Sequence, residues 1–344
     1  MRLEPPGWWY GARARDRLKA ALLAPAGALY GLAASARFAT ARPYRSALPV
    51  ICIGNFTLGG AGKTPLAIEI ARMARDWGCR PAFLTRGYGG RLAGPHRVET
   101  GRDTAHATGD EALLLARTAP TFVAHDRRAG ARAIEASGAD VIIMDDGFQN
   151  PSLVKDLCLI AMDAGASAGN GRVFPAGPMR APLGAQMRRA DAIILIGDGD
   201  PPAKLVARAE ARAVPMMRAA VEPAGDVAWL RTAPAVAFCG IGRPAKFFRT
   251  LEHLSARLVA ALPFPDHHVF TEGDAALLLD TAARAGATLV TTEKDWVRFA
   301  AADGPLSELK AKARALPVRL RIADGDQPRL TALLLRALGR EGRG

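Results

Sequence analysis

Short apolar runs alternate with amphipathic segments along almost the whole chain. The amphipathic segments predict helices after Lys63, after Asp110 and after Asp126, and over 202–213, 244–254, 273–285 and 305–315. The apolar runs are rich in β-branched residues, which predicts strands buried on both faces. Because strands separated by helices form parallel sheets with helices on both faces, the pattern indicates an α/β fold. The predicted strands are Val50–Gly54, Ala82–Thr85, Thr121–Ala124, Val141–Asp145, Leu157–Met162, Ala192–Ile196, Val236–Cys239, Leu258–Leu262, Thr288–Thr291 and Val318–Ile322.

The length of 344 residues favours two domains. A stretch rich in Gly and Pro, 165–182, interrupts the alternation, and we place the connection between the domains near it. The predicted organisation is an N-terminal segment over 1–45, a first α/β domain over 46–182, a second α/β domain over 183–330 and a basic C-terminal tail over 331–344.

The N-terminal segment contains an uncharged run, 20–36, between Lys19 and Arg37. The run is Ala-rich and interrupted by Pro and Gly, so it is a poor candidate for a spanning helix, which needs about 20 predominantly apolar residues. Aromatic residues at 8–10 and the flanking arginines suit the headgroup level of an anionic membrane. Two interpretations stay open: a membrane-associating helix, and an amphipathic helix packed on its own domain.

The composition is that of a globular protein with an excess of positive charge. Hydrophobic residues make up 49% of the chain, which excludes a disordered protein, and 46 Lys and Arg against 33 Asp and Glu give a net charge of +13. The first fifty residues hold eight basic and two acidic side chains, 8 − 2 = +6. The excess indicates an anionic partner. Aromatic residues are only 6% and no nucleic-acid-binding motif is present, so we expect no nucleic acid partner.

The four cysteines are far apart and show no CxxC or zinc-finger spacing. Most of them lie in apolar strand-like runs, where a free thiol behaves as a small hydrophobe. We therefore expect reduced, buried thiols in a cytosolic protein.

A glycine-rich loop connects the first predicted strand to a helix. Its glycines allow successive backbone N–H groups to turn toward phosphate oxygens. The Lys63 ammonium suits the β- and γ-phosphates, and the Thr64 hydroxyl suits Mg²⁺. A βα turn without a nucleotide is the weaker alternative, because strand, loop and helix follow in the expected order. We predict that the chain binds a nucleoside triphosphate through Thr57, Leu58, Gly59, Gly60, Ala61, Gly62, Lys63 and Thr64.

Two carboxylates, Asp145 and Asp146, follow the buried strand Val141–Asp145. Ligands of α/β proteins bind at the carboxyl ends of strands, and an acidic residue at this place in a phosphate-loop protein holds Mg²⁺. Adjacent side chains point in different directions, so we expect one of the two to meet the metal and the other a neighbouring site. Two turn-forming Asp residues are the alternative.

Further polar residues stand at the ends of predicted elements. Asp110 opens a helix, where it is either an N-cap or a carboxylate that takes a proton from a substrate hydroxyl, and spacing alone favours the cap. His267 and His268 are adjacent and cannot both face one metal, which leaves a histidine that orients a carboxylate, or a surface pair. The polar run 291–296 follows a strand, and its chemistry predicts no role.

Taken together, these motifs resemble the tetraacyldisaccharide 4′-kinase family of lipid A biosynthesis. The order and spacing fit from about residue 6 to residue 325, and Thr57, unusual in a generic phosphate loop, is typical of this family. The matching motifs are WWY at 8–10, GNFTLGGAGKTP at 54–65, TRGYGG at 85–90, GDEA at 109–112, DDGFQ at 145–149, GRVFPAGPMRAP at 171–182, FPDHH at 264–268 and TTEKDW at 291–296.

The resemblance implies a fold, an activity and cofactors. The expected fold is two Rossmann-like or P-loop α/β/α domains with mostly parallel sheets, plus an N-terminal membrane-associating helix. The expected reaction transfers the γ-phosphate of ATP, with Mg²⁺, to the 4′-hydroxyl of an acylated glucosamine disaccharide 1-phosphate to give lipid IVA. The expected location is the cytoplasmic face of the inner membrane, peripheral or through the N-terminal helix. The oligomeric state stays open, a monomer included.

The resemblance also implies roles for single residues, beginning with Asp110 as the general base, which reverses the preference for a cap. His267 would be its partner, with His268 as the alternative, and Arg128 is the alternative to Arg127. The implied catalytic residues are Lys63, Asp110, Asp145, Asp146 and His267; the Mg²⁺ ligands are Thr64 and Asp145; and the substrate contacts are Tyr88, Arg127, Gln149 and Arg180.

A second class of function competes with the kinase. A membrane-associated P-loop switch ATPase, which has no small-molecule phosphate acceptor, would share the loop and the acidic pair. That class commonly has an extra lysine early in the loop, and this chain has Thr57 and Leu58 there. The sequence therefore favours the kinase.

Overall fold

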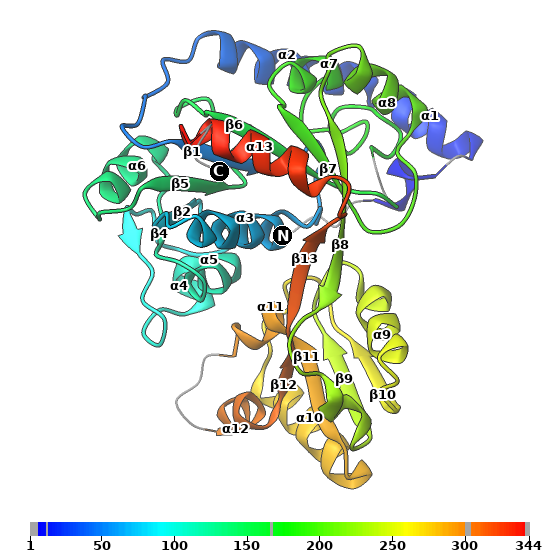
Figure 1. Ribbon diagram of the computed structural model, residues 1–344. Helices are drawn as coiled ribbons and strands as arrows, with labels where there is room; N and C mark the ends of the chain where they lie inside the picture. The colour runs from blue at the N-terminus through cyan, green and yellow to red at the C-terminus, as the bar shows by residue number, and fades with distance from the viewer. Residues whose placement is uncertain (1–5, 12, 166–167, 300–303, 341–344) are drawn as a thin grey trace.

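Two α/β domains and an N-terminal helix pair make up the chain, in a computed structural model that describes residues 6–11, 13–165, 168–299 and 304–340 (Figure 1). The large domain contains a nine-stranded sheet and the small domain a four-stranded sheet. The antiparallel strands β8 and β13 lead from the large sheet toward the small domain (Figure 1). The α/β class and the mostly parallel sheets predicted from the sequence are confirmed.

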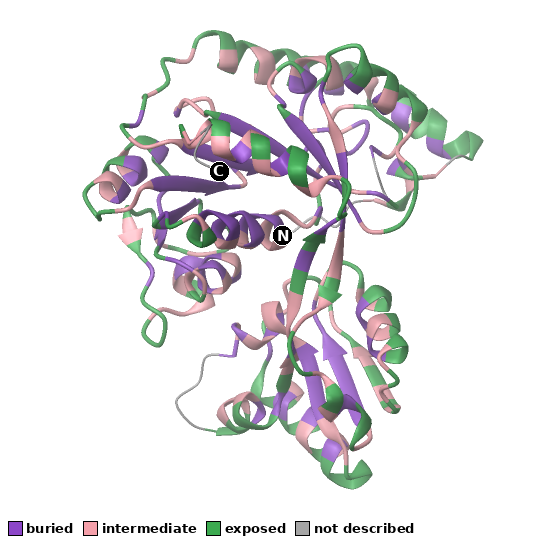
Figure 2. Ribbon diagram, viewed as in Figure 1, coloured by how far each residue is buried: buried purple, intermediate pink, exposed green. Residues whose placement is uncertain are grey.

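The large sheet has the order β13-β8-β7-β6-β1-β5-β2-β4-β3. Its pairings are parallel except β3 with β4 and β8 with β13. The central strands are buried on both faces, as their continuous apolar sequences require (Figure 2). The strands are β1 Val50–Gly54, β2 Pro81–Thr85, β3 His96–Arg97, β4 Thr121–Val123, β5 Val141–Asp145, β6 Leu157–Asp163, β7 Ala192–Ile196, β8 Met216–Pro223 and β13 Val318–Ile322.

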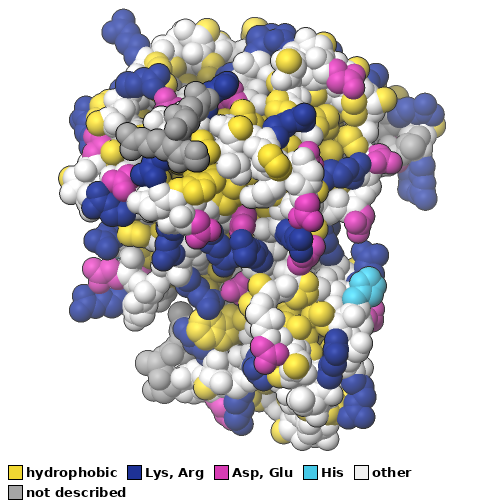
Figure 3. All heavy atoms as spheres, viewed as in Figure 1, with side chains coloured by type: hydrophobic (Ala, Val, Ile, Leu, Met, Phe, Trp, Pro, Cys, Tyr) yellow, Lys and Arg dark blue, Asp and Glu magenta, His cyan; other side chains and the backbone are white. Residues whose placement is uncertain are grey.

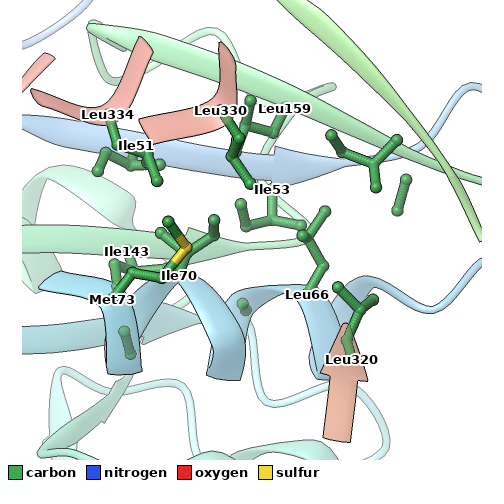
Figure 4. Packing of buried hydrophobic residues seen from close by; sticks show 14 of the residues in the cluster. Ile51, Ile53, Leu66, Ile70, Met73, Ile143, Leu159, Leu320, Leu330 and Leu334 are labelled. Atoms are coloured by element: carbon green, nitrogen blue, oxygen red, sulfur yellow. The ribbon is translucent and has the colours of Figure 1, made fainter. Parts of the chain in front are cut away.

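Helices cover both faces of the large sheet. One face packs against α3 Lys63–Asp76, α5 Asp110–Ala116 and α13 Gln327–Ala337, with Ile51, Leu66 and Leu330 in one apolar cluster (Figure 4). The other face packs against three further helices, and the short α4 Ala105–Thr108 leads into α5. These three are α6 Arg127–Glu135, α7 Leu183–Met187 and α8 Ala203–Glu210.

The small domain has an all-parallel sheet of order β10-β9-β11-β12. Helices α10 and α12 pack on one face of this sheet, and α9 packs on the other with the short helix η2. The elements are η2 Ala228–Arg231, β9 Ala235–Cys239, α9 Pro244–His253, β10 Leu258–Pro263, α10 Glu272–Ala285, β11 Thr288–Thr292, α11 Glu293–Trp296, α12 Gly304–Lys312 and β12 Arg314–Leu316.

The N-terminal segment forms the turn η1 Gly7–Trp9 and two helices, α1 Ala14–Leu22 and α2 Ala24–Ala39, bent by 52°. The sequence predicted one helix here. Pro25 lies in the first turn of α2, where its missing N–H is tolerated although it could not continue α1. Within the described residues no single helix is long and apolar enough to cross a membrane, although the bent pair is by length and composition.

Two predicted boundaries do not match the sheets. Strands β7 and β8 follow residue 182 yet extend the large sheet, because β7 pairs in parallel with β6, so the boundary at 182/183 does not separate the two domains. Part of the predicted tail is helix α13, whose Leu334 is buried in the cluster of Figure 4. Residues 341–344 lie outside the described residues.

The four cysteines are free and buried, as predicted.

Candidate active site at the domain boundary

The phosphate loop leaves the central strand β1 and ends at α3. Gly62 is the N-cap of α3 with φ of 78°, and a Cβ there would lie 2.7 Å from Cδ1 of Ile196, so only glycine fits this turn. The Asn55 side chain donates from Nδ2 to the carbonyl oxygens of Thr57 at 2.6 Å and Gly59 at 3.3 Å. The side-chain amide of Asn55, directly after β1, thus fixes the loop from inside.

The segment 175–180 fixes the loop from outside. Thr57 and Met179 form an antiparallel bridge, and the backbone N–H of Leu58 donates to the Pro178 carbonyl at 2.8 Å. The Arg180 Nε donates to the Thr57 carbonyl at 3.1 Å. The Gly- and Pro-rich stretch, which was predicted to lie near a domain connection, therefore supports the phosphate loop. Thr57 forms a β-bridge with this stretch at the position where a generic phosphate-loop motif has glycine.

Asp145 ends β5 beside this loop. Its Oδ2 accepts a hydrogen bond from the Thr64 hydroxyl at 3.2 Å, and its buried Oδ1 has no partner among the described residues. Burial, together with the negative charge of Glu111, raises the pKa of Asp145 to about 7, although Lys63 opposes the shift. A buried carboxylate with an unused oxygen is an incomplete site that favours a cation.

These residues fit Mg²⁺. The described residues contain no group of three or more His, Cys, Asp or Glu side chains that could hold a metal. Mg²⁺ is commonly held by one or two protein oxygens together with phosphate and water oxygens, so the Asp145 Oδ1 and the Thr64 hydroxyl suit it.

Asp146 faces the cations of the site. It lies 3.7 Å from the Lys63 ammonium and accepts hydrogen bonds from Arg180 at 3.2 and 3.4 Å. Burial opposes ionisation, but Lys63 and Arg180 lower the pKa of Asp146. Its backbone has a φ of 53°, which is uncommon outside glycine. The two adjacent carboxylates therefore meet different groups, as predicted.

Asp110 is the first residue of α5 and is buried. Gly109 is the N-cap, so Asp110 does not occupy the cap position that the sequence favoured, although its Oδ1 accepts a hydrogen bond from the backbone N–H of Glu111 at 2.9 Å. Gly109 has a φ of 87°, and a Cβ there would lie 2.6 Å from the carbonyl oxygen of Tyr88. This close approach sets the Tyr88 loop beside Asp110.

His267 of the small domain reaches Asp110 across the domain boundary. Its Nδ1 lies 3.0 Å from the Asp110 Oδ2, and the Tyr88 ring packs edge-on, with its centroid 6.2 Å from that of the imidazole. His268 instead bonds Asp274 at 2.9 Å, within the capping box of Thr271 at the start of α10. The structure therefore brings His267, and not His268, to the carboxylate.

Arg127 is buried at the start of α6, with 3% of its surface exposed. Burial and the charge of Arg86 lower the pKa of Arg127 to about 10, and its Nε has no partner among the described residues. Arg128 is exposed and donates to the backbone carbonyls of Arg42 and Ser152. An unpaired buried donor near two carboxylates favours Arg127 as the substrate contact.

Gln149 and Arg180 are occupied within the protein. Gln149 donates from Nε2 to the Asn55 carbonyl at 2.7 Å and accepts from Arg180 at 3.3 Å. Tyr88 is 54% exposed. Of the predicted substrate contacts, Gln149 and Arg180 therefore support the phosphate loop and Asp146, whereas Tyr88 presents its ring at the surface of the site.

Sequence reasoning missed three charged residues. The Arg298 guanidinium bonds the Asp110 carboxylate, and the Lys294 ammonium lies 3.2 Å from Glu111. Glu111 links the Asp110 group to the phosphate-loop group, because it follows Asp110 in the chain and its negative charge helps to raise the pKa of Asp145. Figure 3 shows basic and acidic side chains side by side where the two domains meet. Two motifs signalled part of this group: GDEA at 109–112 includes Glu111, and the polar run 291–296 includes Lys294 and stops short of Arg298.

Comparison with known proteins gives full-length matches. Residues 19–339 match the family described as Tetraacyldisaccharide-1-P 4′-kinase. The tetraacyldisaccharide 4′-kinase of Methylobacterium sp. (strain 4-46) is 52% identical over 98% of this chain and 99% of its own. That of Parvibaculum lavamentivorans is 46% identical over 99% of this chain and 100% of its own.

Among solved structures, the fold is similar to that of LpxK from Aquifex aeolicus, crystallised in complex with ATP. The TM-score is 0.71 with 24% sequence identity, over 93% of this chain and 99% of that one. At this identity the likeness concerns the fold, including both domains.

Proposed function

The chain belongs to the tetraacyldisaccharide-1-phosphate 4′-kinase family, and on that premise we propose that the cluster at its domain boundary carries out the phosphoryl transfer. As a member of this family it is an ATP-dependent kinase of lipid A biosynthesis that phosphorylates the 4′-hydroxyl of an acylated disaccharide 1-phosphate. The family favours this activity over a P-loop switch ATPase. One observation carries the proposal: the acidic pair beside the phosphate loop is linked through the charge of Glu111 to the neighbouring Asp110, which is held by cations of the second domain.

The residues of the large domain would bind the nucleotide. The loop amides and Lys63 hold the β- and γ-phosphates of ATP, and Thr64 and Asp145 are the residues that would hold Mg²⁺. The bound Mg²⁺ supplies neutralisation of phosphate charge. Arg180 and Lys63 both pair with Asp146. Arg180 fixes the position of this carboxylate, and the carboxylate in turn positions the Lys63 ammonium.

Asp110 accepts the proton of the acceptor hydroxyl in this mechanism. As the bond between the 4′-oxygen and the γ-phosphorus forms, the bond from that phosphorus to the β–γ bridging oxygen breaks, ADP leaves, and the proton passes to the carboxylate. Burial alone would raise the pKa of Asp110, but His267, Lys294 and Arg298 hold it far below its usual range. The carboxylate is thus a weak base. In a loose transition state, orientation of the hydroxyl matters more than base strength.

We propose that Tyr88 and Arg127 contact the acceptor. The exposed Tyr88 ring offers a face to the sugar, next to His267. The Nε of Arg127, which has no partner in the described part of the chain, offers a donor to a hydroxyl or phosphate oxygen.

The test of this function is a coupled measurement on the purified full chain. It is incubated with Mg-ATP and acylated disaccharide 1-phosphate in detergent micelles, and bisphosphorylated lipid and ADP are both quantified. Equal amounts of the two products support the kinase. Continued release of ADP without a phosphorylated lipid would instead support the switch ATPase.

We also propose that the N-terminal helices attach the enzyme to the cytoplasmic face of the inner membrane. Small residues Gly27 and Gly31 pack α2 against the segment 173–182, so its larger apolar side chains are left outside. Much of α1 and α2 is exposed in Figure 2. The outward residues combine leucines with cations, a pattern that suits an anionic membrane: Leu18 at 62%, Leu22 at 73%, Leu29 at 70% and Leu32 at 68% exposed, with Arg13, Arg15, Arg17, Lys19 and Arg37 also exposed.

We predict that the double variant Leu22→Glu/Leu29→Glu loses membrane binding. Burial of one leucine in an apolar phase is worth about 1.5 kcal/mol or more, so the loss of two should weaken binding at least tenfold. The measurement is co-sedimentation with vesicles that contain phosphatidylglycerol. Leu277→Glu is the matched control, since Leu277 is 56% exposed on α10 of the small domain, and it should sediment like the unaltered protein. Equal sedimentation of the double variant would contradict the proposal.

A further inference from the structure

Arg298 is one of the most buried charged side chains at the domain boundary, with 6% of the side chain exposed. It lies just after α11 in the small domain, next to the segment for which the sequence predicted no role. Its Nε and one terminal nitrogen both donate to the Asp110 Oδ2, at 2.9 and 2.6 Å. A guanidinium that gives two hydrogen bonds to one carboxylate oxygen fixes the position of that oxygen.

The small domain in turn fixes Arg298. Its other terminal nitrogen donates to the Gly240 carbonyl at 2.8 Å and to the Asp295 Oδ1 at 2.5 Å. Asp295 is fully buried and is itself held by the Thr292 hydroxyl at 2.6 Å and the Gly240 N–H at 3.1 Å. The guanidinium therefore has no freedom to follow Asp110, and the position of the carboxylate is set by the ends of β9 and β11.

The two oxygens of Asp110 are used unequally. Oδ2 receives hydrogen bonds from both Arg298 nitrogens and from the His267 Nδ1. Oδ1 receives one bond, from the backbone N–H of Glu111 at 2.9 Å. A carboxylate oxygen has two lone pairs in its plane, so Oδ1 retains a place for one more donor, whereas Oδ2 is saturated.

Lys294 completes the arrangement through His267. Its ammonium, which can only donate, lies 3.4 Å from the His267 Nε2. The Asp110 Oδ2 can only accept, so the His267 Nδ1 donates to it at 3.0 Å, and one terminal nitrogen of Arg298 also lies 3.3 Å from that Nδ1. The cations that face Asp110 from the small domain are Arg298 and Lys294. Glu111 lies 3.2 Å from the Lys294 ammonium, and Asp266 lies 3.9 Å from the His267 Nε2.

We infer that Arg298 is a positioning residue for the phosphoryl transfer: from the small domain it holds Oδ2 of Asp110, so that Oδ1 is the oxygen that receives the acceptor hydroxyl. This inference rests on the proposed role of Asp110. It assigns a function to the contact between the domains, because the carboxylate stands on the nucleotide-binding domain and the groups that orient it stand on the other.

The test is a double-mutant cycle of Asp110→Asn and Arg298→Lys, measured as kcat with full-length protein, Mg-ATP and the acylated disaccharide 1-phosphate. Lysine keeps the charge beside the buried Asp295, so this variant should fold, but it cannot make the paired bonds to Oδ2 and also reach Gly240. We expect Arg298→Lys to lower kcat about tenfold, with KM for ATP within about twofold, and to have no further effect on Asp110→Asn.

A residue that only stabilised the fold would lower kcat by the same factor in both backgrounds, and this result would overturn the inference. A normal kcat for Arg298→Lys would also overturn it. Arg243→Ala is the matched control, because Arg243 makes another ion pair between the domains, 2.6 Å from Asp163. Its kcat should stay within about threefold; an equal loss there would mean that any domain contact has this effect. If Asp110→Asn retained normal turnover, the proposed function of Asp110 itself would fail.

Discussion

Replacement of Asp110 by asparagine is expected to lower kcat by about 10²- to 10³-fold while ATP binding is retained. The change removes the proton acceptor, a contribution of this order in general acid–base catalysis. ATP binding should be unaffected, because the loop that holds the phosphates is fixed by Asn55, Arg180 and Pro178 rather than by Asp110. Steady-state kinetics with the lipid acceptor and calorimetric titration with ATP measure the two effects separately.

The asparagine variant needs its own control for folding. The new side chain would leave the Arg298 guanidinium and the His267 donor facing a neutral amide, so the free energy of unfolding is expected to fall. His267→Ala, which removes a donor to Oδ2 and leaves the carboxylate in place, should therefore cost less turnover than Asp110→Asn. A variant that binds ATP, unfolds cooperatively and still phosphorylates the lipid at the normal rate would refute the role of Asp110.

The fold was predictable where the core is simplest. Each predicted strand is present. Strands such as β1 and β5 are buried on both faces and therefore apolar at every position, which gives an unambiguous pattern, whereas β10 and β13 are partly exposed. Strand β8 was missed: Arg218 and Glu222 interrupt its apolar sequence, and part of its length is exposed. The part of helix α13 from residue 331 was assigned to the tail, because its buried Leu334 lies in a segment rich in arginine.

The domain division failed for a physical reason. The sequence shows a Gly- and Pro-rich stretch at 165–182 and cannot show that this stretch pairs with the phosphate loop. The chain enters the small domain only after β8 and returns through β13, so the small domain is inserted within the large one. Amino-acid composition indicates where loops lie. A domain insertion depends instead on which strands, far apart in the sequence, pair with each other.

The phosphate loop and Asp145 were predictable because each is local in sequence and next to a strand. The group around Asp110 was not predictable from local patterns, since its partners come from the distant segments 264–268 and 291–298, and only the family resemblance paired Asp110 with His267. The choice between His267 and His268 depended on one backbone angle: His267 has a φ of 58°, which turns the two adjacent imidazoles toward different carboxylates. No periodicity in the sequence encodes that angle.

Replacement of Lys63 by methionine is expected to lower kcat by about 10³-fold and to raise KM for ATP. Methionine keeps most of the length of the side chain and removes the charge, which in this mechanism stabilises the negative oxygens between the β- and γ-phosphates. Loss of one such preorganised contact costs about 10²- to 10³-fold in turnover. The Lys63 side chain is 14% exposed, so water cannot replace the ammonium effectively.

The same change should affect stability little. Asp146, 3.7 Å from the Lys63 ammonium, keeps both hydrogen bonds from Arg180, so methionine does not leave this carboxylate unpaired. The loss of activity should therefore occur with a thermal midpoint close to that of the unaltered protein. Lys204→Met, on the exposed surface of α8, is the matched control and should change neither quantity. If Lys63→Met retained turnover, the phosphates would have to be neutralised by another cation of the site, and Arg127, whose Nε is unpaired, would be the first to test by the same substitution.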